Sequence, residues 1–109
     1  MDTTSILTDT PQNVVRKYYR ELISHHIPVK HMIMFGSYAK GTNTKWSDLD
    51  ICVVSDDFGK DGWKELIMLK KLTAAVDTMI EPHPYNPNDL TDRYDPLAKE
   101  IRTYGIQII

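Results

Sequence analysis

The sequence has almost no cysteine and no long apolar run. The single Cys52 cannot form an internal disulfide, which fits a reducing, cytoplasmic compartment. No apolar segment reaches the roughly 20 residues that a helix needs to cross a bilayer. The first residues also lack the basic and then apolar pattern of a signal peptide. The sequence therefore argues against zinc fingers, disulfide-rich scaffolds and membrane anchors.

An excess of charge of one sign is missing as well. The chain carries 13 Lys and Arg against 15 Asp and Glu, a formal net charge of −2. This balance argues against nucleic acid as a direct ligand, because proteins that coat nucleic acid are strongly basic. A length of 109 residues predicts one domain with one modest core.

Apolar spacing and turn residues predict an α+β fold, a small mixed β-sheet packed by helices in an α/β sandwich. Residues 1–10 are rich in threonine and expected to be flexible, so the single domain is placed at 11–109. Helices are expected from Pro11 to before Pro28, over Trp63–Val76 and over Asp95–Tyr104, and strands over Lys30–Phe35, Asp48–Val54, Thr78–His83 and Ile106–Ile109. Three prolines, Pro82, Pro84 and Pro87, predict that the third strand is an edge or exit segment.

Residues 36–50, GSYAKGTNTKWSDLD, carry the strongest indication of chemistry. Asp48 and Asp50 lie two positions apart at the start of an expected strand, so their side chains leave the same face, roughly 6.5–7 Å apart along the chain. Two such carboxylates repel each other unless a cation joins them, and hard oxygen ligands suit Mg²⁺. An isolated pair of this kind is also typical of a strand edge that faces water.

Gly36 and Ser37 directly follow the first expected strand. Glycine lets the backbone approach a ligand closely, and the free N–H groups at the start of a helix favour an anion. Lys40 and Lys45 add positive charge to the same loop, whereas Gly41 is not followed by the Lys-Ser of a P-loop. Together with the carboxylate pair, this turn supplies the parts needed for metal-assisted nucleotidyl transfer.

These motifs resemble those of the DNA polymerase beta-like nucleotidyltransferase superfamily, specifically its minimal, MNT-type members. The resemblance rests on Gly36-Ser37-Tyr38-Ala39-Lys40-Gly41 and Ser47-Asp48-Leu49-Asp50 and covers roughly residues 11–109. It implies a polymerase-beta-like core, two Mg²⁺ ions and an NTP donor, with ATP as the expected nucleotide. The implied reaction transfers a nucleoside monophosphate, AMP in the expected case, to an acceptor hydroxyl.

The resemblance also implies roles for individual residues. Asp48 would bridge both metal ions and Asp50 would bind them alongside. Gly36 and Ser37 would hold the β- and γ-phosphates. The expected nucleotide-binding set comprises Gly36, Ser37, Lys40, Gly41 and Ser47.

The resemblance also implies a third carboxylate on the strand that follows the pair. Glu81 is favoured because it follows the apolar Met79-Ile80, and there it would bind the second metal ion and draw the proton from the attacking hydroxyl. Asp77 stays open as the alternative, since it also suits the end of the preceding helix. His83, two residues after Glu81, is a further candidate to line the site.

The partners are also predicted from the resemblance. Minimal members often sit beside a small helical partner protein, in toxin–antitoxin pairs where the nucleotidyltransferase is the antitoxin and modifies the toxin with AMP. Two alternatives stay open: a non-catalytic, antitoxin-like binding module and an aminoglycoside-type small-molecule nucleotidyltransferase. The apolar segment Ile106–Ile109 is a candidate pairing edge, so a homo- or hetero-oligomer is expected.

Overall fold

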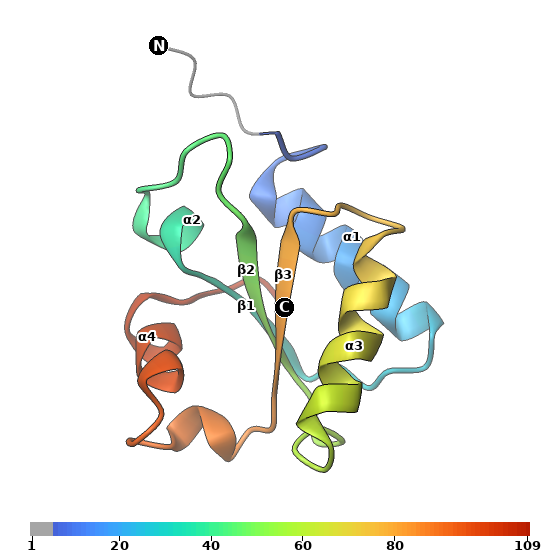
Figure 1. Cartoon of the computed structure of the whole chain (residues 1–109), viewed down its shortest axis with the longest axis vertical. Helices are drawn as coiled ribbons and strands as arrows, with labels where there is room; N and C mark the ends of the chain where they lie inside the picture. The colour runs from blue at the N-terminus through green and yellow to red at the C-terminus, as the bar shows by residue number, and fades with distance from the viewer. Residues whose placement is uncertain (1–5) are drawn as a thin grey trace.

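A computed structural model describes residues 6–109 as a four-stranded mixed sheet with helices on both faces (Figure 1). The elements in chain order are α1 (Pro11–Ser24), β1 (His31–Phe35), α2 (Ser37–Lys40), β2 (Leu49–Val54), α3 (Gly62–Thr73), β3 (Ile80–Tyr85), the 3-10 turn η1 (Asp89–Thr91), α4 (Pro96–Tyr104) and β4 (Ile106–Gln107). The strand order is β3-β2-β1-β4, with β2 and β3 parallel and β1 antiparallel to both of its neighbours. The expected fold class is confirmed. None of the helices within the described range is long and apolar enough to cross a membrane.

Different helices cover the two faces of the sheet. In Figure 1 the sheet is seen nearly edge-on with β3 in front, α1 and α3 to its right and α2 and α4 to its left. Alternation along β2 sends Leu49, Ile51 and Val53 into the main core under α1 and α3. The residues between them face the smaller core under α4. Asp50 therefore lies on the α4 side of the sheet.

β3 is an edge strand that contains two prolines. The carbonyl of Tyr85 faces β2, where it accepts a hydrogen bond of 3.0 Å from the backbone N–H of Ser55. Alternate residues of a strand direct their backbone groups to the same side, so Pro82 and Pro84 face the open edge. A proline at that position removes no hydrogen bond from the sheet. The edge position expected from the prolines is confirmed.

The ends of several elements differ from the expectation: β3 continues to Tyr85, past the expected His83, and β4 ends at Gln107, before the expected Ile109. β3 begins at Ile80 and not at Thr78, because the Asp77 carbonyl and carboxylate accept hydrogen bonds from Ile80 N (3.2 Å) and Met79 N (2.9 Å) and form a turn. α3 ends at Thr73, before the expected Val76. Hydrogen bonds of a side chain to the nearby backbone, such as those of Asp77, help to decide where an element begins or ends. The spacing of apolar residues does not predict them.

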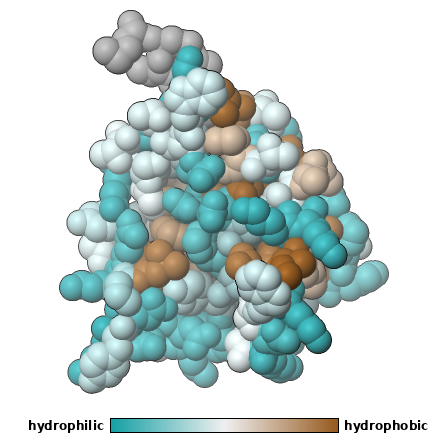
Figure 2. All heavy atoms as spheres, in the orientation of Figure 1, coloured by the Kyte–Doolittle hydropathy of each residue, from teal (hydrophilic) through white to brown (hydrophobic). Residues whose placement is uncertain are grey.

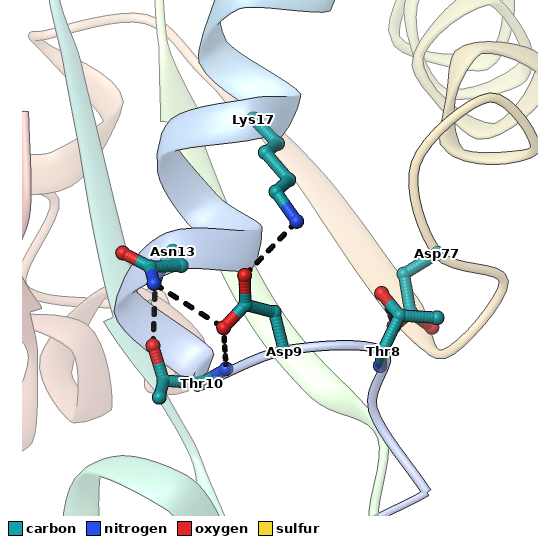
Figure 3. A network of polar contacts seen from close by, with 6 residues as sticks. All are labelled: Thr8, Asp9, Thr10, Asn13, Lys17 and Asp77. Atoms are coloured by element: carbon teal, nitrogen blue, oxygen red, sulfur yellow. Dashed lines mark hydrogen bonds and ion pairs between the residues drawn. The ribbon is translucent and has the colours of Figure 1, made fainter.

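Residues 6–10 are tied to the rest of the chain (Figure 3). The backbone N–H and hydroxyl of Thr8 both donate to Asp77 Oδ2, at 2.8 and 3.0 Å. The carboxylate of Asp9 accepts from Lys17 Nζ at 2.9 Å, and this bond, with that from the Thr10 N–H, holds the pKa of Asp9 near 2. The expectation of a flexible stretch over 1–10 did not anticipate these contacts; residues 1–5 lie outside the described range.

Helix α3 exposes apolar side chains on the side away from the sheet. Trp63, Ile67 and Met68 are 71%, 36% and 37% exposed, and Figure 2 shows hydrophobic residues over α3 among hydrophilic ones. A groove of about 400 Å³ between this helix and the end of α1 is bordered by Lys64 and Lys71. Exposed apolar patches bordered by polar groups are typical of surfaces that contact another protein.

Candidate active site

The turn from β1 into α2 brings Gly36 against Asp50. Gly36 has φ +72° and ψ −150°, a conformation that residues with a Cβ essentially do not adopt. A Cβ built at this position would overlap the Asp50 carboxylate, with Oδ2 as the nearest atom. Glycine is therefore required here both by the backbone conformation and by the close approach of a carboxylate.

Helix α2 is a single turn that starts at Ser37. Backbone bonds from Lys40 N to the Gly36 carbonyl (3.1 Å) and from Thr42 N to the Ser37 carbonyl (3.0 Å) close it, and Gly41 ends it with a left-handed φ of +73°. The first N–H groups of a helical turn have no acceptor within the turn. The Ser37 end is therefore the part of this loop suited to an anion.

Lys40 lies at the other end of α2 and reaches α4. Its Nζ is 2.7 Å from Glu100 Oε1 and 4.9 Å from the centre of the Tyr104 ring. The hydrogen bond to Glu100 raises the pKa of Lys40. In this structure Lys40 is therefore paired with Glu100, and the contact links α2 to α4.

Ser47 closes the loop that leads to the carboxylate pair. Its Oγ accepts from Thr44 N at 2.9 Å, and its own N–H donates to the Thr44 carbonyl at 3.2 Å. Trp46 in the same loop is 68% exposed, with Lys45 Nζ 5.1 Å from the centre of its ring. The Ser47 hydroxyl therefore holds the shape of this loop.

Three acidic residues, Asp48, Asp50 and Glu81, lie toward the same end of β2 and β3. Asp48 is exposed and immediately precedes β2, and Asp50 is the second residue of that strand. The parallel register places Glu81 of β3 directly beside Asp50, at the interstrand spacing of about 4.8 Å. His83 follows on the same face, and its Nε2 is 3.4 Å from Asp50 Oδ1. Across residues 6–109, no three His, Cys, Asp or Glu side chains are gathered closely enough to form a ready-made metal site.

Asp77, the alternative third carboxylate, lies elsewhere. It is only 6% exposed, and its two oxygens accept from Thr8 and from Met79 N. Glu81 is half-buried and next to Asp50. The structure therefore brings Glu81, and not Asp77, beside the pair. The role of Asp77 depends on Thr8, 69 positions earlier, which local spacing does not reveal.

Substitutions of these two acidic residues should lower the free energy of unfolding by very different amounts. Asp77→Ala is expected to lower the free energy of unfolding by about 3 kcal/mol, because it removes the acceptor of three part-buried hydrogen bonds from Thr8 and Met79, each worth about 1 kcal/mol. Glu81→Gln is expected to change it by less than about 1 kcal/mol, since the side chain is half-exposed. Urea denaturation of both variants measures the difference. Equal losses would contradict this division of roles.

Further along β2 and β3 from Asp50, the face of the sheet that α4 covers is apolar. Cys52 is fully buried, and burial raises the pKa of its thiol to about 12, so it stays protonated and serves as a core residue. The Tyr85 hydroxyl donates to Asp95 at 2.8 Å, which lowers the pKa of that carboxyl, and Asp95 also caps α4 by accepting from Leu97 N. These bonds fix α4 over this region and leave the end with Asp50 open.

A cavity of about 380 Å³ follows the open edge of β3 and begins at His83. Its other lining residues are Gly62, Leu66, Pro84, Tyr85, Asp89, Asp92 and Asp95. Sequence analysis did not find this cavity, because its residues come from α3, β3 and the segment after it. The three aspartates make it unsuited to a triphosphate, so the Ser37 end remains the candidate phosphate site.

The fold and the family to which the sequence is similar place this chain among the nucleotidyltransferases. The chain matches the model of the nucleotidyltransferase domain family over residues 15–104, and it belongs to that family. It is 31% identical over 81 residues to "Putative protein adenylyltransferase MJ1379" of Methanocaldococcus jannaschii, which covers 70% of this chain and 80% of the relative. The family membership expected from the Gly-Ser and Asp-x-Asp motifs is confirmed.

Solved structures show the same fold. A "putative nucleotidyltransferase" from Sulfolobus solfataricus superposes with a TM-score of 0.64 at 14% identity, over 88% of this chain and 77% of that one. A toxin–antitoxin structure solved with AMP-PNP gives a TM-score of 0.56 at 26% identity, over 90% and 72% of the two chains. A mutant of the toxin–antitoxin pair MntA-HpeT gives 0.58 at 22% identity, over 86% and 71%.

Proposed function

We propose that this protein transfers AMP from ATP to a hydroxyl group on a partner protein. The observation that carries the proposal is the close approach of Gly36, at the start of the Ser37 turn, to Asp50, with Glu81 directly across the strand pair. This arrangement puts an anion-binding turn and a carboxylate cluster side by side. The similarity to a protein named as an adenylyltransferase and to a structure solved with AMP-PNP supports AMP as the transferred group.

The donor set suits Mg²⁺. Asp48, Asp50 and Glu81 offer hard carboxylate oxygens, and within residues 6–109 none of the three forms an ion pair with a lysine or arginine. These three residues would hold the ion, which when bound neutralises triphosphate charge and acidifies the attacking hydroxyl. Because uncompensated carboxylates repel each other, we infer that the cation draws together groups that are spread in its absence.

The remaining chemistry belongs to the protein's own groups. Backbone N–H groups at Ser37 would bind the β- and γ-phosphates and orient the triphosphate. The Glu81 carboxylate would take the proton of the acceptor hydroxyl. The hydroxyl oxygen then bonds to the α-phosphorus, the bond from that phosphorus to the bridging oxygen breaks, and pyrophosphate leaves.

A small helical protein in the same cytoplasm is the proposed acceptor. The solved structure with AMP-PNP is a toxin–antitoxin complex, which supports a protein partner. The exposed apolar surface of α3 supports contact with another protein as well. The single, buried cysteine is consistent with a reducing compartment.

Transfer of label from ATP tests this function. The purified protein is incubated with Mg²⁺, a cell extract, and ATP radiolabelled at either the α- or the γ-phosphate. We expect a protein band that is labelled from the α-phosphate only and that disappears with chelator. Absence of label with any divalent metal, together with partner binding that survives Asp50→Ala, would favour the non-catalytic binding module.

A further inference from the structure

The reaction described above assigns no task to His83, although this side chain lies against Asp50. His83 Nε2 is 3.4 Å from Asp50 Oδ1, and the two side chains are 26% and 28% exposed. In the parallel register of β2 and β3, His83 lies opposite Cys52. This pair follows the pair Asp50 and Glu81 on the same face of the sheet, two residues further along each strand. The imidazole therefore sits at the inner border of the carboxylate cluster and points a ring nitrogen at it.

The ring of His83 is held in place by an aromatic neighbour. The Phe35 ring packs against it edge to face, with centroids 5.0 Å apart and an interplanar angle of 62°. Phe35 is itself buried and is the register partner of Asp50 across β1 and β2. A contact of this geometry favours one orientation of the imidazole, and that orientation directs Nε2 toward the carboxylate.

The backbone around His83 is restricted as well. In the run Glu81-Pro82-His83-Pro84, both non-proline residues precede a proline, which disfavours helical backbone angles for each of them. The prolines fix their own φ and lose no sheet hydrogen bond, because they face the open edge. β3 thus presents Glu81 and His83 from a stiff, extended backbone on one face.

The two oxygens of Asp50 are consequently contacted from two sides. Oδ2 lies against the backbone of Gly36, in the space that a Cβ would fill, and Oδ1 lies against His83 Nε2. Each carboxylate oxygen has two lone pairs, so both atoms keep the capacity to bind a cation. The contacts with Gly36 and His83 restrict the rotation of the Asp50 carboxylate, and both of its oxygens can still coordinate a metal ion.

We propose that His83 is a positioning residue that holds the Asp50 carboxylate in the orientation that binds the divalent ion of the metal–nucleotide complex. The proposal rests on the proposed function, because it concerns the same site. Groups that hydrogen-bond a metal-binding side chain typically change metal affinity 10- to 100-fold. His83 acts through Asp50 and does not contact the nucleotide in this assignment.

Manganese binding provides a test that does not depend on turnover. Mn²⁺ is titrated into the protein in the presence of α,β-methylene-ATP, in which the bond that would break is blocked, and free Mn²⁺ is measured by electron paramagnetic resonance. We expect His83→Leu to weaken Mn²⁺ binding by about 10- to 100-fold. His83→Gln, which keeps an N–H donor at a similar reach, should stay within about threefold of the wild type. His31→Gln, on β1 with its ring 3.3 Å from Gln107, is the matched control and should bind like the wild type.

The outcomes separate the two proposals. Wild-type protein that binds no Mn²⁺–nucleotide complex overturns the proposed function and the role of His83 with it. Binding by the wild type and equal or tighter binding by His83→Leu overturns only the role of His83. If His83→Leu does not fold, His83→Asn replaces it, since its shorter amide does not reach Asp50; affinity equal to that of His83→Gln would then overturn the proposal.

Discussion

The Asp50→Asn variant is expected to lose about 1,000-fold or more of nucleotidyl transfer while it keeps its fold. Asparagine has nearly the same shape, so the packing of the side chain against Gly36 is preserved. The neutral amide removes the negative charge that attracts the divalent ion, and one of its ends cannot act as a ligand. A loss of this size corresponds to about 4 kcal/mol of transition-state stabilisation.

The rate of label transfer from ATP radiolabelled at the α-phosphate measures this loss, and urea denaturation verifies that the variant is folded. Asp56→Asn is the matched control. Asp56 follows the same strand at its other end, with a side chain 73% exposed and 3.9 Å from Lys30 Nζ. The Asp56→Asn variant should transfer label at a rate within about twofold of the wild type. An Asp50→Asn variant that is as active as this control would refute the placement of the site.

Gly36→Ala should damage both stability and transfer. The left-handed φ of +72° and the ψ of −150° strain any residue with a Cβ, and the new methyl group also displaces the Asp50 carboxylate. We expect a loss of about 3 kcal/mol in the free energy of unfolding, which combines backbone strain with steric overlap. Transfer should fall at least about 100-fold, because a displacement near 1 Å of a catalytic group has effects of that size.

Gly59→Ala is the control that separates backbone strain from overlap. Gly59 also has a left-handed φ, +96°, but a Cβ there would meet only Asn86 Cβ and Asp89 Oδ2, at 3.4 and 3.5 Å. The free energy of unfolding of the Gly59→Ala variant should fall by about 1 kcal/mol because of backbone strain. Its rate of nucleotidyl transfer should stay unchanged. Denaturation curves and transfer rates for both variants make the comparison. Similar transfer rates in the two alanine variants would mean that the approach of Gly36 to Asp50 has no functional importance.

Much of the fold was predictable because the relevant signals are local. Apolar alternation places Leu49 and Ile51 in the main core and therefore Asp50 on the opposite face. Pro82 and Pro84 indicate an edge strand, since an interior strand needs their missing N–H groups. The start of β3 was predicted two residues too early, because the turn at Asp77 depends on hydrogen bonds from its own side chain.

Long-range contacts were not predictable in the same way. Lys40 has the charge expected of a phosphate ligand, yet its nearest anion in the structure is Glu100 of α4. The carboxylate that pairs with Lys40 belongs to α4, which is distant from α2 in the sequence. A basic residue in a glycine-rich loop therefore indicates positive charge near the site but not which anion it contacts.

By itself, the sequence determined the α+β class, the glycine turn and the carboxylate pair of this nucleotidyltransferase, because strand alternation and turn chemistry act between neighbours in the chain. Only the tertiary structure decided that Glu81 and not Asp77 joins Asp50, and that His83, 33 positions from Asp50, contacts it. The reason is physical. The register of β2 on β3 and the anchoring of Asp77 by Thr8 are set by packing between distant segments, and no local pattern encodes that packing.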